Sequence, residues 1–238
     1  MTSRIDLGDL VIAVTRKDIK HVHLNVHPPA GRVSMAAPRH LSDEALRAFA
    51  IGKLGWIRQQ RRRFVAQSRE PTREYLDRET HYVWGQRCLL QILDSASSPE
   101  VEWRGTRLVL HIRLGSQPGK RKEVLERWYR DQVREEVERL RVSWERRLRV
   151  RASGLGVRAM RTRWGSCNPD TGFIRLNTDL ARKPRECLEY ILVHELLHLR
   201  VPLHDATFKT LLDQYMPGWM HRRDLLNRLP LRHEDWSY

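Results

Sequence analysis

The chain has 238 residues and carries 44 Lys and Arg against 29 Asp and Glu, so its formal net charge is +15. With 40% hydrophobic residues and eight Trp, it is expected to fold around a core and not to behave as a disordered basic tail. The longest uninterrupted apolar run, residues 10–14, is far shorter than the roughly twenty residues of a membrane span, so we expect no membrane-spanning segment.

The N-terminus and the cysteines favour a cytoplasmic location. No apolar stretch follows the charge at Arg4, so the pattern of a secretory signal is missing. Cys88, Cys167 and Cys187 form no CxxC pair and leave one thiol over in any disulfide scheme. We therefore expect a reducing compartment, with the thiols as small core residues.

The positive net charge restricts the classes of binding partner to be expected but does not identify a single partner. It comes mainly from 37 Arg spread over nearly the whole chain. Net basicity attracts nucleic acid, nucleotides and anionic surfaces non-specifically. Non-specific nucleic acid contact through the basic surface is thus one expected partner, and solvated surfaces of an Arg-biased chain are the alternative.

The first part of the chain is expected to be rich in antiparallel strands. Residues 10–14 form an apolar run, and residues 22–26 alternate apolar and polar in the period-2 pattern of a half-buried strand. A helix is expected to begin at Ser42, whose side chain can cap it, and to continue to about Phe64. Residues 80–115 return to strand-like alternation.

A domain boundary is expected near the Gly- and Pro-containing segment 115–119, the best linker candidate of the chain. This divides the chain into an N-terminal β-rich region, residues 1–117, and a second domain, residues 118–238. A long amphipathic helix over 121–149 opens the second domain. Its buried stripe is expected to consist of Val124, Leu125, Trp128, Val133, Val137, Leu140 and Trp144.

The most informative segment is 190–200, on a helix that is expected to begin near Pro184. It places His194 and His198 four residues apart, on one face and one turn from each other, so that two imidazoles can bind one metal ion. Glu195 is offset by about 100° from His194, beside the ion without pointing at it, as a general base requires.

A catalytic zinc ion needs a third protein ligand and an open position. His204 is the candidate, because Pro202 disfavours continuation of the helix and the resulting turn can fold His204 back onto the ion. Cys167 as a fourth ligand would close the site and make it structural, which is the alternative that remains open.

Residues 161–177 read as strand, turn and strand, and such a hairpin could present an edge strand to an extended peptide. The tetrahedral oxyanion of peptide hydrolysis also needs a positive or hydrogen-bonding partner besides the ion. The candidates are Arg161, Arg163 and Tyr215, and for each a purely structural role is the competing interpretation.

These motifs resemble the YgjP-like metallopeptidase family, which is related to the SprT-like zincins. The resemblance is carried by residues 161–167 (RTRWGSC), Leu176-Asn177, the segment 184–190 that leads into the HExxH motif, residues 194–200 (HELLHLR), and His204 with Phe208. It implies a zinc-dependent hydrolase with Glu195 as base and with His194, His198 and His204 as ligands. Two positions depart from the family: Leu203 stands where Asn is usual, and Asp205 where Ser is common.

The expected fold class is therefore α+β. It combines an N-terminal antiparallel β-rich half carrying a helix with a zincin-like C-terminal half, in which a long helix and a β-hairpin accompany the HExxH active-site helix. The expected function is zinc-dependent hydrolysis of peptide bonds in a protein or peptide substrate, with Glu195 moving the proton.

Two other functions stay open at this point. Because an Arg-rich surface attracts phosphates, the same ion could serve a hydrolase of nucleotide phosphoanhydrides, although the chain has no GxxxxGK[ST] loop. The other is a nucleic-acid-binding protein with a structural zinc ion, which predicts salt-dependent binding without turnover.

Overall fold

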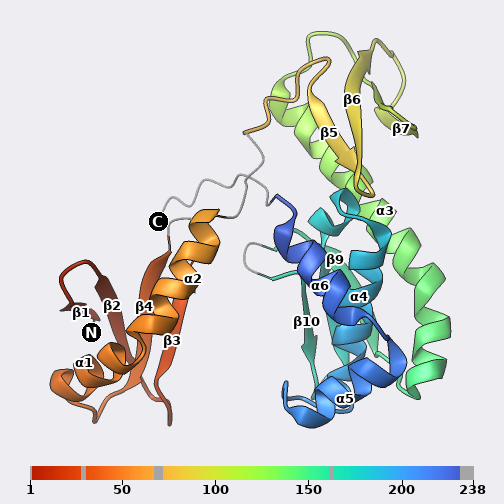
Figure 1. The fold of residues 1–238 in the computed structure, drawn as a ribbon. Helices are drawn as coiled ribbons and strands as arrows, with labels where there is room; N and C mark the ends of the chain where they lie inside the picture. Colours follow the sequence, from red (N-terminus) through yellow and green to blue (C-terminus); the bar gives the residue numbers. More distant parts are fainter. Residues whose placement is uncertain (1, 28–30, 67–71, 161–162, 231–238) are drawn as a thin grey trace. The chain divides into compact units, whose positions relative to one another are not determined.

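The computed structural model describes residues 2–27, 31–66, 72–160 and 163–230 (Figure 1). Within these ranges the chain forms eleven β-strands, six α-helices and one 3₁₀-helix, which confirms the expected α+β fold class. The chain divides into two compact units, one of residues 1–68 and the other of residues 69–238.

The first unit is built on a four-stranded sheet with the order β1-β2-β4-β3. Its strands are β1 (Thr2–Asp6), β2 (Val11–Lys17), β3 (His23–His27) and β4 (Arg32–Pro38). The outer pairs β1–β2 and β3–β4 are antiparallel as expected, whereas β2 and β4 run parallel, so the sheet is mixed. The strands with fully buried side chains, such as Ile12 and Val14 of β2 and Val33 and Met35 of β4, occupy its centre.

Two helices cover this sheet where the sequence predicted one. Ser42 caps α1 (Asp43–Gly52) as expected, its Oγ accepting the Ala45 N–H at 3.2 Å. The helical direction is interrupted at Lys53, which has φ −105° and ψ 2°, and α2 (Leu54–Ala66) follows. Leu46, Ala50 and Ile57 are buried in the core of this unit.

The second unit begins with another four-stranded sheet, of order β5-β6-β8-β7. Its strands are β5 (Thr80–Val83), β6 (Gln86–Leu93), β7 (Glu100–Arg104) and β8 (Arg107–His111). The long helix α3 (Pro118–Leu148) shares one continuous core with this sheet and with the elements that follow it. Figure 1 shows β5, β6 and β7 beside the first half of α3 and α4 beside its second half.

The division expected at 117/118 therefore coincides with the start of α3 and lies inside the second unit. Of the expected linker 115–119, Pro118 and Gly119 already belong to α3. The expected stripe is buried except at Trp128 and Leu140, which are partly buried against the core. Although α3 is 31 residues long, no helix in the described ranges is apolar enough over a sufficient length to cross a membrane.

A three-stranded sheet and three further helices complete the second unit. The hairpin of β10 (Gly165–Asn168) and β11 (Phe173–Asn177) is antiparallel as expected, and β9 (Gly154–Arg158), which the sequence did not predict, runs parallel to β11. β9 contains two glycines because the Phe173 ring lies over it: a Cβ at Gly154 would come 2.7 Å from that ring. The 3₁₀-helix η1 (Thr178–Arg182) leads to α4 (Arg185–Leu197), α5 (Ala206–Tyr215) and α6 (Trp219–Arg228).

Candidate metal centre

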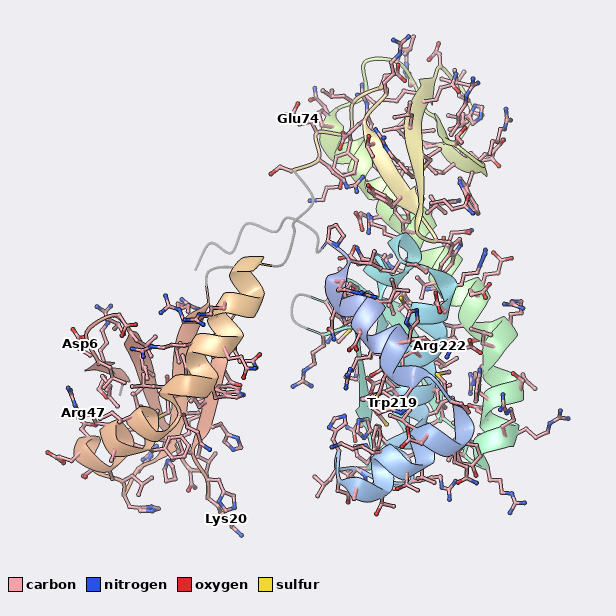
Figure 2. The ribbon with its side chains drawn as sticks, in the orientation of Figure 1. Asp6, Lys20, Arg47, Glu74, Trp219 and Arg222 are labelled. Atoms are coloured by element: carbon pink, nitrogen blue, oxygen red, sulfur yellow. The ribbon has the colours of Figure 1, made fainter. Side chains whose placement is uncertain are left out.

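Helix α4 carries the first part of the site, and it lies inside the second unit. It packs against α3, α6 and the β10–β11 hairpin. α6 carries Trp219, which is labelled in Figure 2. Its ring stacks on Tyr190 of α4 at 6.3 Å, and its Nε1 donates to Asp213 at 2.7 Å. Because α4 is held on several sides, its side chains keep fixed positions. Its buried residues are Cys187, Leu188, Tyr190, Ile191, Leu192, Val193, Glu195, Leu196 and Leu197.

The chain turns sharply after α4, as the position of Pro202 predicts. The helix ends at Leu197, and the N–H groups of Leu199 and Arg200 donate to carbonyls three residues earlier, at 3.1 and 2.9 Å. This tight turn reverses the chain and returns His204 to the end of the helix. The structure thus brings the three predicted ligands, His194, His198 and His204, into one cluster.

The donor atoms of this cluster are close enough to share one ion. His204 Nε2 lies 2.8 Å from His194 Nε2 and 3.1 Å from His198 Nε2. Two nitrogen ligands of a tetrahedral zinc ion, each at about 2.0–2.1 Å, lie about 3.3 Å apart. The three imidazoles therefore fit a zinc ion with an open fourth position.

A backbone hydrogen bond orients one of these imidazoles. His198 Nδ1 lies 3.2 Å from the Val201 carbonyl oxygen. Since a carbonyl only accepts, this contact assigns the proton to Nδ1 and leaves the Nε2 lone pair for a metal. His194 Nδ1 is buried and has no hydrogen-bond partner among the described residues.

Phe208 of α5 forms the floor of the cluster. Its ring centroid lies 4.9 Å from that of His194, 4.7 Å from that of His198 and 4.9 Å from that of His204. Asp205 caps α5 by accepting the Phe208 N–H at 3.0 Å. One of the two departures from the family thus has a clear role, since it holds the backbone between His204 and Phe208. The sequence pattern does not reveal the contact of Phe208 with all three imidazoles.

Burial keeps the imidazoles of α4 neutral. Desolvation, followed by the neighbouring His198 and His204, lowers the pKa of His194 to about 3. Desolvation is also the main cause that lowers the pKa of His198. A metal ligand must be the neutral imidazole, so this environment suits metal binding at neutral pH.

Glu195 lies beside the cluster and against the strand β10. Its side chain is buried and accepts a hydrogen bond from the Cys167 backbone N–H. Desolvation raises its pKa to about 7, although the positive charge of Arg163 and the Cys167 N–H act in the opposite direction. The carboxyl group can therefore both accept and release a proton near neutral pH.

Strand β10 is at one end of its sheet, with β11 as its neighbour in the described part of the chain. The segment before it is held by Asn177, whose side-chain amide donates to the carbonyls of Met160 and Arg163 at 2.8 and 2.9 Å. The Asn177 Oδ1 accepts the Asp179 N–H at 3.1 Å. Asn177 was part of the resemblance, but its bridging role depends on contacts that the sequence does not reveal.

The remaining predicted residues lie in different places. Arg163 is exposed and its charge acts on Glu195, whereas Arg161 lies outside the described residues. The Tyr215 hydroxyl is 3.5 Å from Arg200 Nη1, which places it in the contact between α5 and the turn after α4. Cys167 is not part of the histidine cluster found among the described residues, and desolvation raises the pKa of its thiol to about 11.

Comparison with known proteins identifies one family over most of the chain. The model of the family described as YgjP-like, metallopeptidase domain, matches residues 20–229. A search of curated proteins finds no significant match. The matched range covers nearly all of the second unit, with every residue of the cluster, and it covers the first unit from residue 20 on, without β1 and β2.

Proposed function

Because the chain belongs to the YgjP-like metallopeptidase family, we propose that it hydrolyses peptide bonds with a zinc ion held by His194, His198 and His204. Glu195 is the proposed general base. The observation that carries this proposal is the convergence of three Nε2 atoms, with donor atoms within 4.8 Å of one another, next to a buried carboxylate.

A bound zinc ion would supply Lewis acidity, which polarises a carbonyl group and makes water a stronger acid. Glu195 would accept the proton of the attacking water as the new C–O bond forms. It would then deliver this proton to the amine nitrogen as the C–N bond breaks. The Cys167 N–H holds the carboxylate in place for both transfers.

The position of β10 at the end of its sheet, as far as the structure describes the chain, supports a peptide as substrate. An extended peptide can add to a sheet edge through main-chain hydrogen bonds, and β10 runs directly beside Glu195. For the developing negative charge, Arg163 is the best supported contact because its charge already acts at Glu195. Tyr215, held near Arg200, and Arg161 remain candidates with less support.

Zinc analysis combined with turnover of a denatured protein substrate tests the proposal. Glu195→Gln should keep about one zinc ion per chain and lose about 10²–10⁴-fold in rate, the usual contribution of a general base. Glu186→Gln, the same change in the first turn of α4, is the matched control and should keep the wild-type rate.

Persistent wild-type turnover in zinc-loaded Glu195→Gln would contradict the assignment of the base. Nucleoside triphosphates should be incubated with both proteins in parallel. Hydrolysis of nucleotides that depends on Glu195, without hydrolysis of protein, would replace the peptidase by a phosphoanhydride hydrolase.

A further inference from the structure

A cavity of about 630 Å³ lies beyond the C-terminal end of α4, between the end of α3 and the turn that joins β10 to β11. We call it the arginine basin, because Arg141, Arg149, Arg151 and Arg200 are among the residues that line it. Residues 169–172 of the hairpin turn form the opposite wall.

Four arginines and one carboxylate, that of Asp170 in the hairpin turn, are in the lining of the arginine basin, so the lining has a net positive charge. Arg141 is paired with Glu145 at 2.8 Å, and Arg200 donates to the uncharged Leu148 carbonyl at 3.2 Å. Arg149 and Arg151 are exposed and make no ion pair within the described ranges. An excess of guanidinium groups around one cavity is suited to an anionic ligand.

The backbone at Arg149 has an unusual conformation for an arginine. Arg149 ends α3 with φ 53° and ψ 45°, the left-handed conformation that glycine adopts at helix ends without strain. An arginine at this position is strained, and the fold itself would favour glycine. Arg78 has a similar backbone conformation, with φ 63°, so this strain alone assigns no function; what distinguishes Arg149 is its place in the lining of the basin.

The basin is continuous with the proposed catalytic centre along two segments. Arg200 follows the ligand His198 by two residues. Residues 169–172 follow β10 directly, and the start of β10 lies against Glu195. At about 3.3 Å per residue, a peptide extended along β10 past Glu195 would reach the basin within a few residues.

We propose that the arginine basin binds acidic side chains of the peptide substrate, a few residues from the bond that is cleaved. This inference rests on the proposed peptidase function. Arginine pairs with a carboxylate through two parallel hydrogen bonds. The neighbouring edge of β10 can pair with a peptide backbone, a feature that nucleic acid does not have, and this favours an acidic peptide over a nucleic acid.

Binding of a labelled peptide to the full chain tests the inference without any need for turnover. The zinc-loaded Glu195→Gln protein is titrated with a peptide that contains several Asp and Glu, and with a twin in which these are Asn and Gln. In about 0.15 M salt we expect the acidic peptide to bind at least about fivefold more tightly. In the double variant Arg149→Gly/Arg151→Gln this preference should disappear.

The chain offers a closely matched control in Arg78→Gly/Arg146→Gln. Arg78 is exposed and also has a positive φ, 63°, and Arg146 is exposed in the last turn of α3. Neither lines the basin, and the control loses the same charge by the same substitutions. It should keep the preference for the acidic peptide. Arg149→Gly alone, which relieves backbone strain, carries the test if the double variant fails to fold.

Three results would overturn the inference. First, the zinc-loaded Glu195→Gln protein could bind both peptides equally. Second, the control variant could lose the preference as fully as the basin variant, which would mean that the preference depends only on the net charge of the protein. A single-stranded oligonucleotide of equal charge could bind more tightly than the acidic peptide and depend on the basin, which would make the basin a nucleic acid site. If the binding pattern holds but wild-type protein shows no peptidase turnover, the proposed function fails and the acidic-peptide site stands.

Discussion

Gly165 of β10 lies in direct contact with the Glu195 side chain. A Cβ at Gly165 would come 2.6 Å from Glu195 Oε1 and 2.8 Å from its Cγ, closer than real carbon contacts allow. The edge strand and the proposed base therefore fix each other's positions. Gly165 is needed here for its small size, because its φ is not in the left-handed region.

Gly165→Ala should therefore reduce peptide turnover while leaving the metal in place. A shift of the carboxylate by about 1 Å can cost about 10²-fold in rate, so we expect kcat/KM to fall by about 10- to 100-fold. Gly119→Ala is the matched control, since a Cβ there would meet no atom within 4 Å. Full activity of Gly165→Ala would show that Glu195 does not depend on this contact.

His204→Ala should weaken zinc binding without unfolding the protein, because His204 is exposed in the turn after α4. Loss of a metal ligand should lower the zinc affinity by more than the about 10- to 100-fold that follows the loss of a group that only orients a ligand. In the wild type, zinc at about 100 times its Kd should raise the unfolding midpoint by about 5–10 °C, and chelation should reverse this.

The exposed His221 of α6 provides the control for that experiment. His221→Ala should show the same zinc-dependent rise in midpoint as the wild type, whereas the rise should be absent or much smaller in His204→Ala. An undiminished zinc response in His204→Ala would remove His204 from the ligand set.

The spacing of residues along the chain explains why the metal cluster could be predicted. His194 and His198 occupy one helix face, so their proximity depends only on local geometry. The approach of His204 required one more inference, that Pro202 ends the helix, and the turn at Leu199 and Arg200 agrees with it.

Other parts of the structure could not be predicted because they depend on contacts between distant segments. The closeness of Gly165 to Glu195 results from packing of β10 on α4, which no local pattern encodes. β9 is short and contains two glycines, so it lacks the alternation that identifies a strand, and its glycines become meaningful only beneath Phe173. The left-handed Arg149 looks like any other residue of an Arg-rich helix.

Asn177→Ala should lower both stability and activity. Asn177 is 4% exposed, and its amide satisfies the carbonyls of Met160 and Arg163. Leaving such buried groups without partners costs about 1–3 kcal/mol each, so we expect a loss of about 2–4 kcal/mol in the free energy of unfolding. Turnover measured well below the new midpoint should still be reduced, because the backbone leading into β10 loses its anchor.

The exposed Asn25 of β3 is the control for this substitution, and Asn25→Ala should change the free energy of unfolding by less than about 0.5 kcal/mol. If Asn177→Ala is destabilised but turns over substrate at the wild-type rate below its midpoint, then Asn177 supports the fold without positioning β10.

His81 should make the second unit less stable in acid. It is fully buried, its Nδ1 lies 3.4 Å from the Tyr129 hydroxyl, and its Nε2 has no hydrogen-bond partner in the described part of the chain. Desolvation, followed by the charges of Arg73 and Arg182, lowers its pKa to about 2.

An unfolded histidine has a pKa of about 6.5, so between about pH 6.5 and 2 the unfolded chain binds a proton that the folded chain does not. The contribution of His81 to stability is therefore fully present above about pH 6.5. It is lost as the pH falls, by up to about 1.4 kcal/mol per pH unit.

Urea unfolding of the wild type and of His81→Phe between pH 7 and 5 measures this loss of stability. His81→Phe keeps the ring beside Tyr75, and its free energy of unfolding should fall less steeply with pH. Equal slopes in the two proteins would show that His81 is already protonated in the folded state.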